Sequence, residues 1–222
     1  MATLVLIIGK SGSGKSASLR NFEPDDVDVI NVEAKPLPFR SRIQTIDTDN
    51  YREISKTIKD SKKKVIVVDD ASYLITNSFM RGHASQGGGN AMFSFYNQLA
   101  DDFWKLVMWL RSLDKEKIIY IIMHEQKNDF GDIKPKTIGK LLDDKVTIEG
   151  MFTIVLRSIT RDGKYLFRTH TDDFDVAKSP IGMFDADEID NDLRMVDQTI
   201  REYYGFGVNE VGTNDKEAAG IR

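Results

Sequence analysis

The chain has 222 residues, is 41% hydrophobic and carries a formal net charge of −4. That length and apolar content suffice for one domain with a single buried core. The negative charge excludes a protein that binds nucleic acid with its whole surface, so such a contact has to use a local patch or loop. Because the chain has no cysteine, it forms neither disulfides nor thiolate metal sites.

The histidines and the N-terminus exclude further classes. His83, His124 and His170 are scattered and lack metal-ligand spacing. The chain opens directly into an apolar strand, without the charged segment, long apolar stretch and cleavage site of a secretion signal. No apolar run approaches the length that spans a bilayer. We therefore expect a soluble, cytosolic protein with no membrane partner.

Four short apolar runs, rich in β-branched residues, predict strands that are buried on both faces. They cover residues 3–8, 27–32, 65–68 and 118–123. Two later runs, 152–157 and 165–169, predict a β-hairpin that turns at Asp162-Gly163. Alternation of buried strands with helices predicts an α/β fold with a mostly parallel, twisted sheet flanked by helices. The hairpin extends that sheet in antiparallel fashion near its C-terminal end.

Helices are predicted between these strands. A short one follows the first strand to about Asn21, and Thr48 or Asp49 can cap another that runs toward Lys59. Pro36 and Pro38, between the two helices, exclude regular structure over several residues.

A long helix is predicted over residues 91–113, where apolar residues recur every three to four positions. Asn90 can cap it, and the glycine-rich stretch 82–90 before it predicts a mobile loop. Residues 188–204 predict a final amphipathic helix. We expect one domain over residues 1–204 and a flexible tail over 205–222, because the tail is polar and Gly-rich.

The segment from Gly9 to Ser16 satisfies the pattern G-x-x-x-x-G-K-[ST], between a buried strand and a helix-compatible segment. Its glycines let successive backbone N–H groups point inward around phosphate oxygens, and the helix that follows adds its positive N-terminal end. Lys15 reaches the β- and γ-phosphates, and the Ser16 hydroxyl binds Mg²⁺. The pattern predicts binding of a nucleoside triphosphate, most simply ATP with Mg²⁺. The predicted binding residues are Gly9, Lys10, Ser11, Gly12, Ser13, Gly14, Lys15, Ser16 and Ala17.

Acidic and polar side chains follow three of the other predicted strands. Asp69 directly ends the strand at 65–68, as expected of the carboxylate that holds Mg²⁺, while Asp70 orients water or caps the next segment. Glu33 follows the second strand and is a candidate general base or an ordinary loop residue. Ligands of open α/β sheets bind beyond the carboxyl ends of the strands. Polar residues after the fourth strand, at 124–126, are therefore candidates to contact the γ-phosphate, or they simply end that strand.

The order of these features resembles the RecA-like recombinase ATPases. The matching pieces are GKSGSGKS, INVEAKP, VIVVDD, GHASQGGGN, IIYIIMHEQ and the stretch 127–145. The chain looks most like the compact, bacteriophage-encoded members linked to single-strand annealing and recombination. Segments 177–184 and 189–193 add to that impression. The resemblance covers roughly residues 3–204.

The resemblance implies roles for particular residues. Glu33 would be the water-activating base and Gln126 the γ-phosphate sensor, beside the catalytic Lys15 and Asp69. Loops 79–90 and 127–145 would face single-stranded DNA, with Lys127, Lys134, Lys136 and Lys140 on its phosphates. Acidic residues dilute that patch, so a merely solvated loop stays open. The implied setting is a homo-oligomer in the host cytoplasm, with a phage single-strand-binding or replication protein as a further partner.

Two other classes remain open. A small-molecule or nucleoside kinase also uses a phosphate loop, and it would need an arginine-bearing lid, for which Arg157, Arg161 and Arg168 are available. A nucleotide-gated binding or packaging factor would bind ATP with little turnover. For an oligomeric ATPase, Lys140, Arg157 or Arg161 could serve as a cation supplied to a neighbouring subunit.

Overall fold

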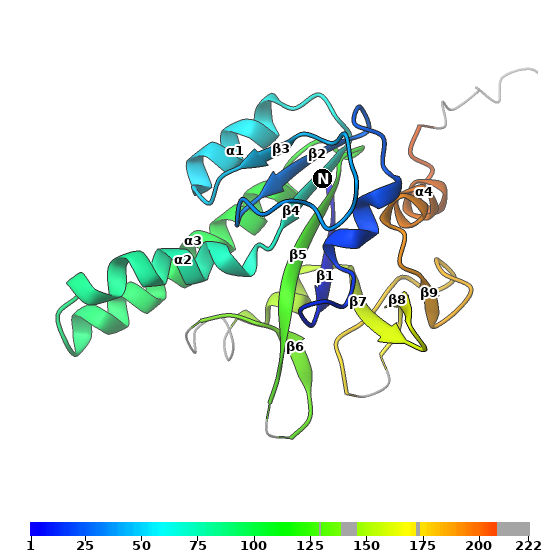
Figure 1. The fold of residues 1–222 in the computed structure, drawn as a ribbon. Coiled ribbons are helices and arrows are strands. Elements are labelled where there is room, and N and C mark those ends of the chain that lie inside the picture. The colour runs from blue at the N-terminus through cyan, green and yellow to red at the C-terminus, as the bar shows by residue number, and fades with distance from the viewer. Residues whose placement is uncertain (129, 139–145, 172–173, 208–222) are drawn as a thin grey trace, which may run out of the picture.

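The predicted parallel sheet is present in the computed structural model, which describes residues 1–128, 130–138, 146–171 and 174–207. Its parallel strands are β1 (Thr3–Gly9), β2 (Val27–Asn31), β3 (Thr45–Asp47), β4 (Val65–Asp69), β5 (Ile118–Lys127) and β7 (Ile154–Arg161). Antiparallel strands β8 (Lys164–Arg168) and β9 (Glu188–Asp190) continue the sheet, and β6 (Ile133–Pro135) pairs with β5. The strand order is β3-β2-β4-β5-β1-β7-β8-β9 (Figure 1). The structure confirms the predicted mixed α/β fold.

Helices cover both faces of this sheet. On one face lie α1 (Tyr51–Asp60), α2 (Ser72–Gly82) and α3 (Asn90–Arg111); on the other lie the 3₁₀ helix η1 (Ser16–Asn21) and α4 (Leu193–Tyr204). Two further 3₁₀ turns are η2 (His83–Ser85) and η4 (Ile148–Met151). Alternate β1 side chains pack on opposite faces: Leu6 joins the core under α1–α3, and Ile7 joins the core under η1 and α4. Full burial of each such side chain contributes about 1.5–3 kcal/mol, which explains the uninterrupted apolar runs.

The position of β5 decides which residues meet at the edge of the sheet where β1 and β4 end, which we call the functional edge. β5 lies between β1 and β4, and the register pairs Gly9 with His124 and Val68 with Ile121. Because all three strands run parallel, their carboxyl ends open on the same edge of the sheet. The residues that follow β1, β4 and Met123 of β5 are therefore brought together.

Helix starts differ from the sequence predictions. Asn50, rather than Thr48 or Asp49, caps α1, and its side-chain oxygen accepts hydrogen bonds from the backbone N–H groups of Arg52 and Glu53. Thr48 instead donates its hydroxyl to the Glu53 carboxylate. At α3 the cap position falls on Gly89, whose φ of 65° requires a glycine-like backbone, and Asn90 is the first helical residue.

Tertiary contacts also redistribute structure around these elements. The predicted glycine-rich loop starts later, because α2 extends to Gly82 and η2 follows it. Residues 188–190 were predicted as helix but form β9, which pairs with β8, and α4 begins at Leu193 after the cap Asp192. The predicted hairpin is confirmed: Asp162 and Gly163 have φ of 50° and 73°, as a tight two-residue turn requires.

Two predictions fall partly outside the described residues. The tail prediction concerns 205–222, of which 208–222 are not described. The stretch 127–145 contains β6 rather than loop alone, and residues 129 and 139–145, which include Lys140, are not described. Among the helices in the described ranges, none has the length and apolar character to span a bilayer.

Candidate functional site

The phosphate-loop segment has the backbone that its sequence requires. Gly12 and Gly14 adopt φ of 78° and 97°, and a Cβ on Gly9 would lie 2.5 Å from the Ser13 hydroxyl oxygen. Close packing and left-handed backbone at these positions exclude larger residues. The Lys15 Nζ donates to the Lys10 carbonyl oxygen at 2.9 Å. The ammonium group therefore reaches back over the loop, to the place where a phosphate is held.

Lys15 is enclosed rather than solvated. Its side chain is buried, and this burial lowers its pKa, although Asp70 and Asp69 nearby favour the charged form. The segment after it is the six-residue 3₁₀ helix η1. A 3₁₀ helix this short adds less dipole than a longer α-helix would. Phosphate binding here has to depend on the loop amides and on Lys15.

Asp69 ends β4 and faces the phosphate loop. The Ser16 hydroxyl lies close enough to favour the ionised carboxylate, while Oδ1 has no hydrogen-bond partner among the described residues. Burial raises the pKa of Asp69 to about 6. A buried carboxylate oxygen without a donor is costly, and Mg²⁺ would satisfy it. Ser16 and Asp69 thus fit a magnesium ion that takes its remaining ligands from water and phosphate, and bound Mg²⁺ would neutralise phosphate charge.

Asp70 is directed into the same site by an unusual backbone. Its φ is 59°, in the left-handed region that non-glycine residues seldom occupy. His124 Nε2 lies 3.3 Å from Asp70 Oδ1, and Lys35 Nζ lies 3.7 Å from Oδ2. Although burial opposes it, the contacts with His124 lower the pKa of Asp70. Asp70 is therefore an ionised carboxylate between two basic groups.

Glu33 lies next to this group, held by two neighbours. Asn77 of α2 donates to Glu33 Oε1 at 2.9 Å, and Lys35 Nζ lies 3.5 Å from Oε2. Ala34, between Glu33 and Lys35, has φ of 52°. This backbone turn brings both side chains to the same edge of the sheet.

A cavity of about 330 Å³ joins these parts. Lys15, Ser16, Ala17, Asp69, Asp70 and Lys35 line it, together with the segment 36–38 and the aromatic rings of Tyr73, His124 and Tyr165. Glu33 and Gln126 are not among its lining residues. His124, at the end of the buried part of β5, therefore meets the cavity, whereas Gln126 lies further along the strand and pairs with Lys134.

Tyr165 and the 35–38 segment were missed at the sequence level. A Cβ on Gly14 would lie 2.8 Å from the Tyr165 ring, so β8 packs directly on the phosphate loop. No local pattern connects residue 165 with residue 14, because only the pairing of β7 with β1 and β8 brings them together. The prolines at 36 and 38 signalled a loop but not its position over the cavity.

The arginines considered for a lid or a neighbouring site are engaged within the chain. Arg157 contacts Glu125 at 2.8 Å and Asp175 at 3.2 Å. Arg161 contacts Glu188 at 2.7 Å, and Arg168 contacts both Asp175 and Glu188. All three lie on β7 or β8. This arrangement stabilises the sheet beside the loop rather than covering the site.

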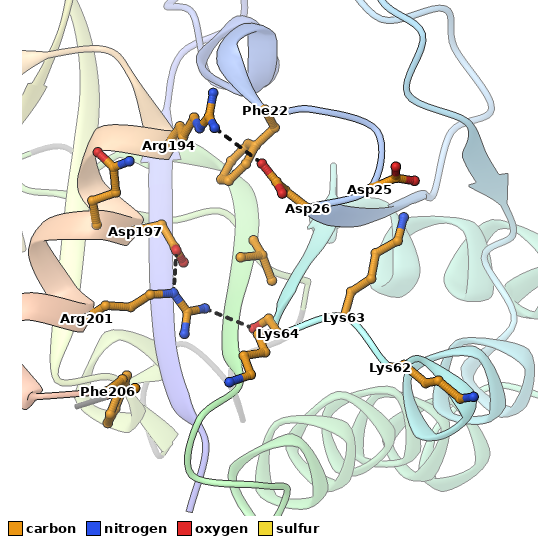
Figure 2. Close-up of a pocket in the computed structure, with 13 residues that line it drawn as sticks. Phe22, Asp25, Asp26, Lys62, Lys63, Lys64, Arg194, Asp197, Arg201 and Phe206 are labelled. Atoms are coloured by element: carbon orange, nitrogen blue, oxygen red, sulfur yellow. Dashed lines mark hydrogen bonds and ion pairs between the residues drawn. The ribbon is translucent and has the colours of Figure 1, made fainter. Parts of the chain in front are cut away.

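A larger cavity, of about 630 Å³, lies at the opposite edge of the sheet, where β4 begins. Figure 2 shows Arg194 directed toward Asp26 and Arg201 directed toward Asp197 in this cavity. Arg201 contacts Asp197 at 2.7 Å, and Arg194 contacts Asp26 at 3.5 Å. These two arginines thus already have carboxylate partners, whereas the smaller cavity is lined by Asp69, whose buried Oδ1 has no hydrogen-bond partner among the described residues. The smaller cavity is the better candidate site.

Three of the four predicted DNA-facing lysines lie on or directly after the strands of the β5–β6 hairpin, and the fourth, Lys140, lies outside the described residues. Lys127 and Lys136 are exposed, and Lys134 is half-buried. The backbone N–H of Lys136 donates to the His124 carbonyl oxygen at 2.7 Å. The hairpin is therefore bonded directly to the strand end that meets the cavity.

In this parallel sheet the first strand, β1, ends in the phosphate loop, and β4, which ends in Asp69, is separated from β1 by β5 alone. This combination defines the class of P-loop NTPases. A family model described as an AAA domain matches residues 1–181. The chain belongs to this family of P-loop ATPases, and membership implies nucleotide binding and hydrolysis. A comparison with curated proteins found no significant match.

Proposed function

We propose that this protein is a Mg²⁺-dependent, RecA-like ATPase that acts on single-stranded DNA in phage recombination, annealing or replication. The observation that carries the ATPase part is the buried Asp69 carboxylate beside the enclosed Lys15, with Oδ1 left without a hydrogen-bond partner among the described residues. Residues 1–204 form the ATPase domain in this proposal, and residues 205–222 are a tail.

In this proposal Lys15 and the loop amides bind the phosphates, and Ser16 and Asp69 hold the metal. Glu33 takes the proton of the attacking water once its contacts with Lys35 and Asn77 loosen. Asp70 is the alternative base, since it lines the cavity. His124 contacts the terminal phosphate directly, while Gln126 senses it at a distance, through the hairpin that it forms with Lys134.

The deciding experiment measures phosphate release from ATP with and without single-stranded DNA. We expect DNA to raise turnover of the wild-type protein and Lys15→Ala to abolish it. Glu33→Gln and Asp70→Asn, compared side by side, identify the base as the one whose loss costs more, about 10²–10⁴-fold. A phosphorylated small molecule in place of free phosphate would instead support the kinase alternative.

The DNA part rests on the position of the β5–β6 hairpin. Lys127 and Lys136 can contact backbone phosphates, and Phe130, which is 88% exposed, can stack on a base. The double variant Lys127→Ala/Lys136→Ala should lose DNA stimulation, whereas Lys59→Ala on α1 should keep it. If DNA changes neither turnover nor ATP affinity of the wild-type protein, the DNA role is wrong.

A homo-oligomer is part of the same proposal. Size measurement of the wild-type protein with Mg²⁺ and ATP, alongside Lys15→Ala, tests whether assembly depends on nucleotide. A mass that stays monomeric under all conditions would contradict it.

A further inference from the structure

Lys35 is held in place by its backbone. The buried side chain of Asn31, at the end of β2, donates from Nδ2 to the Lys35 carbonyl oxygen at 2.8 Å and accepts from the Lys35 N–H at 3.4 Å. Ala34 before it has φ of 52°, and Pro36 after it fixes the next φ. Asn31 also donates to Asp47, which anchors the turn to β3. The turn is therefore built, and Lys35 is positioned on it.

The side chain of Lys35 faces the phosphate-loop cavity but makes only loose contacts there. Its Nζ lies 3.5 Å from Glu33, 3.7 Å from Asp70 and 4.9 Å from the centre of the Tyr73 ring. These ion pairs are longer than the 2.7–2.9 Å of strong charge-assisted hydrogen bonds. The side chain is also 57% exposed. The ammonium can therefore leave these partners without a large desolvation cost.

The charge around the cavity calls for such a cation. Asp69 and Asp70 line the cavity and Glu33 lies beside it, so a terminal phosphate placed there meets carboxylates on its far side. Lys15 approaches the phosphates from the loop, and Asp69 and Asp70 lie near enough to offset part of its charge. Among the described residues that line the cavity, Lys15 and Lys35 are the lysines, and no arginine lines it. The arginines Arg157 and Arg161 contact Glu125 and Glu188 instead.

We propose that Lys35 is a catalytic residue: the same chain supplies, through Lys35, the cation that binds the terminal phosphate of ATP opposite Lys15. This role rests on the proposed ATPase function. Water forms the new bond to the γ-phosphorus, the bond to the ADP oxygen breaks, and the water proton goes to the carboxylate base. As Lys35 moves to the phosphate, it releases Glu33 Oε2 for that proton. Lys35 also stabilises the charge that develops on the transferred phosphoryl group.

The test compares Lys35→Met, Lys35→Arg and the control Lys62→Met, an exposed lysine at the opposite edge of the sheet. Binding of Mg²⁺·ATP and Mg²⁺·ADP is measured by equilibrium titration, and phosphate release is measured separately. We expect Lys35→Met to weaken ATP binding about tenfold or more and ADP binding less than about twofold, because the lost contact is a charged hydrogen bond to the terminal phosphate. Turnover should fall about 10²-fold. Lys35→Arg should retain most of both, and Lys62→Met should match the wild type.

Three results would overturn this role. Equal losses of ATP and ADP affinity in Lys35→Met would mean that Lys35 only supports the turn. Wild-type affinity and turnover in Lys35→Met would exclude any contact with the phosphate. Failure of the wild-type protein itself to bind ATP would overturn the proposed function and this role together, which separates it from the first two results.

Discussion

The cavities at the two edges of the sheet differ in how their polar groups are satisfied. At the edge where β4 begins, the larger cavity is lined by arginines and aspartates that contact one another. At the edge where β4 ends, the smaller cavity is lined by Asp69, whose buried carboxylate oxygen Oδ1 has no hydrogen-bond partner among the described residues. Buried polar groups are normally hydrogen-bonded, so an exception indicates a ligand more reliably than volume does.

The largest expected effect is the loss of ATP turnover when Asp69, at the functional edge, is replaced. Asp69→Asn keeps the shape of the side chain but removes the charge that would hold Mg²⁺ beside Ser16. We expect ATP turnover to fall about 10²–10³-fold, as for loss of one preorganised charge-stabilising group. Phosphate release at saturating Mg²⁺ measures this. Asp197→Asn is the matched change at the other edge and should leave turnover within about twofold at temperatures where the protein stays folded; a comparable loss there would remove the distinction between the edges.

The same substitution, Asp69→Asn, should raise the stability of the protein although it lowers turnover. Its pKa is raised from 3.8 to about 6 in the folded state, so the folded protein binds the proton more tightly than the unfolded chain does. This proton binding contributes about 3 kcal/mol to the free energy of unfolding. The contribution is fully present below about pH 4 and is lost as the pH rises through about 6.

Denaturant unfolding without Mg²⁺ or nucleotide tests this. Relative to the wild type, Asp69→Asn should gain stability between pH 4 and pH 7, because asparagine cannot ionise. A stability difference between the two proteins that does not change with pH would contradict the burial of an ionised Asp69.

Removing an ion pair at the other edge, where β4 begins, should change stability but not turnover. Arg201→Ala leaves Asp197 buried, where the Tyr120 hydroxyl still donates to it. We expect a loss of about 2 kcal/mol in the free energy of unfolding, below the value for fully buried pairs because Arg201 is partly exposed. Arg194→Ala, which removes a more exposed pair with Asp26, should cost less than about 1 kcal/mol. Urea unfolding measures both, and equal losses would show that burial does not set the difference.

The smallest expected effect distinguishes His124 from Gln126, and so shows how far the functional edge extends along β5. His124→Ala removes a donor to Asp70, and we expect turnover without DNA to fall about tenfold. Gln126→Ala should change DNA-free turnover less than about threefold and should reduce stimulation by DNA instead, because Gln126 pairs within the hairpin. Phosphate-release rates measured with and without DNA distinguish the two residues. A larger loss of DNA-free turnover in Gln126→Ala than in His124→Ala would show that Gln126, rather than His124, contacts the terminal phosphate.

Local patterns in the sequence determined the parts of this protein that need no distant partner. The apolar runs predicted β1, β2, β4 and the buried part of β5, since continuous burial selects β-branched residues. The phosphate loop was readable because its glycines are required by backbone φ values that other residues avoid. The hairpin turn at Asp162-Gly163 was readable for the same reason.

Tertiary structure decided the rest, because pairing between distant strands leaves no local periodicity. Insertion of β5 between β1 and β4 places His124 against Asp70 and leaves Gln126 further out. Sheet pairing also converts residues 188–190 into β9 and packs Tyr165 on Gly14. The turn that aims Lys35 at the cavity depends on hydrogen bonds from Asn31. Spacing along the chain could predict which side chains are available, but only the folded sheet decides which of them face the same phosphate.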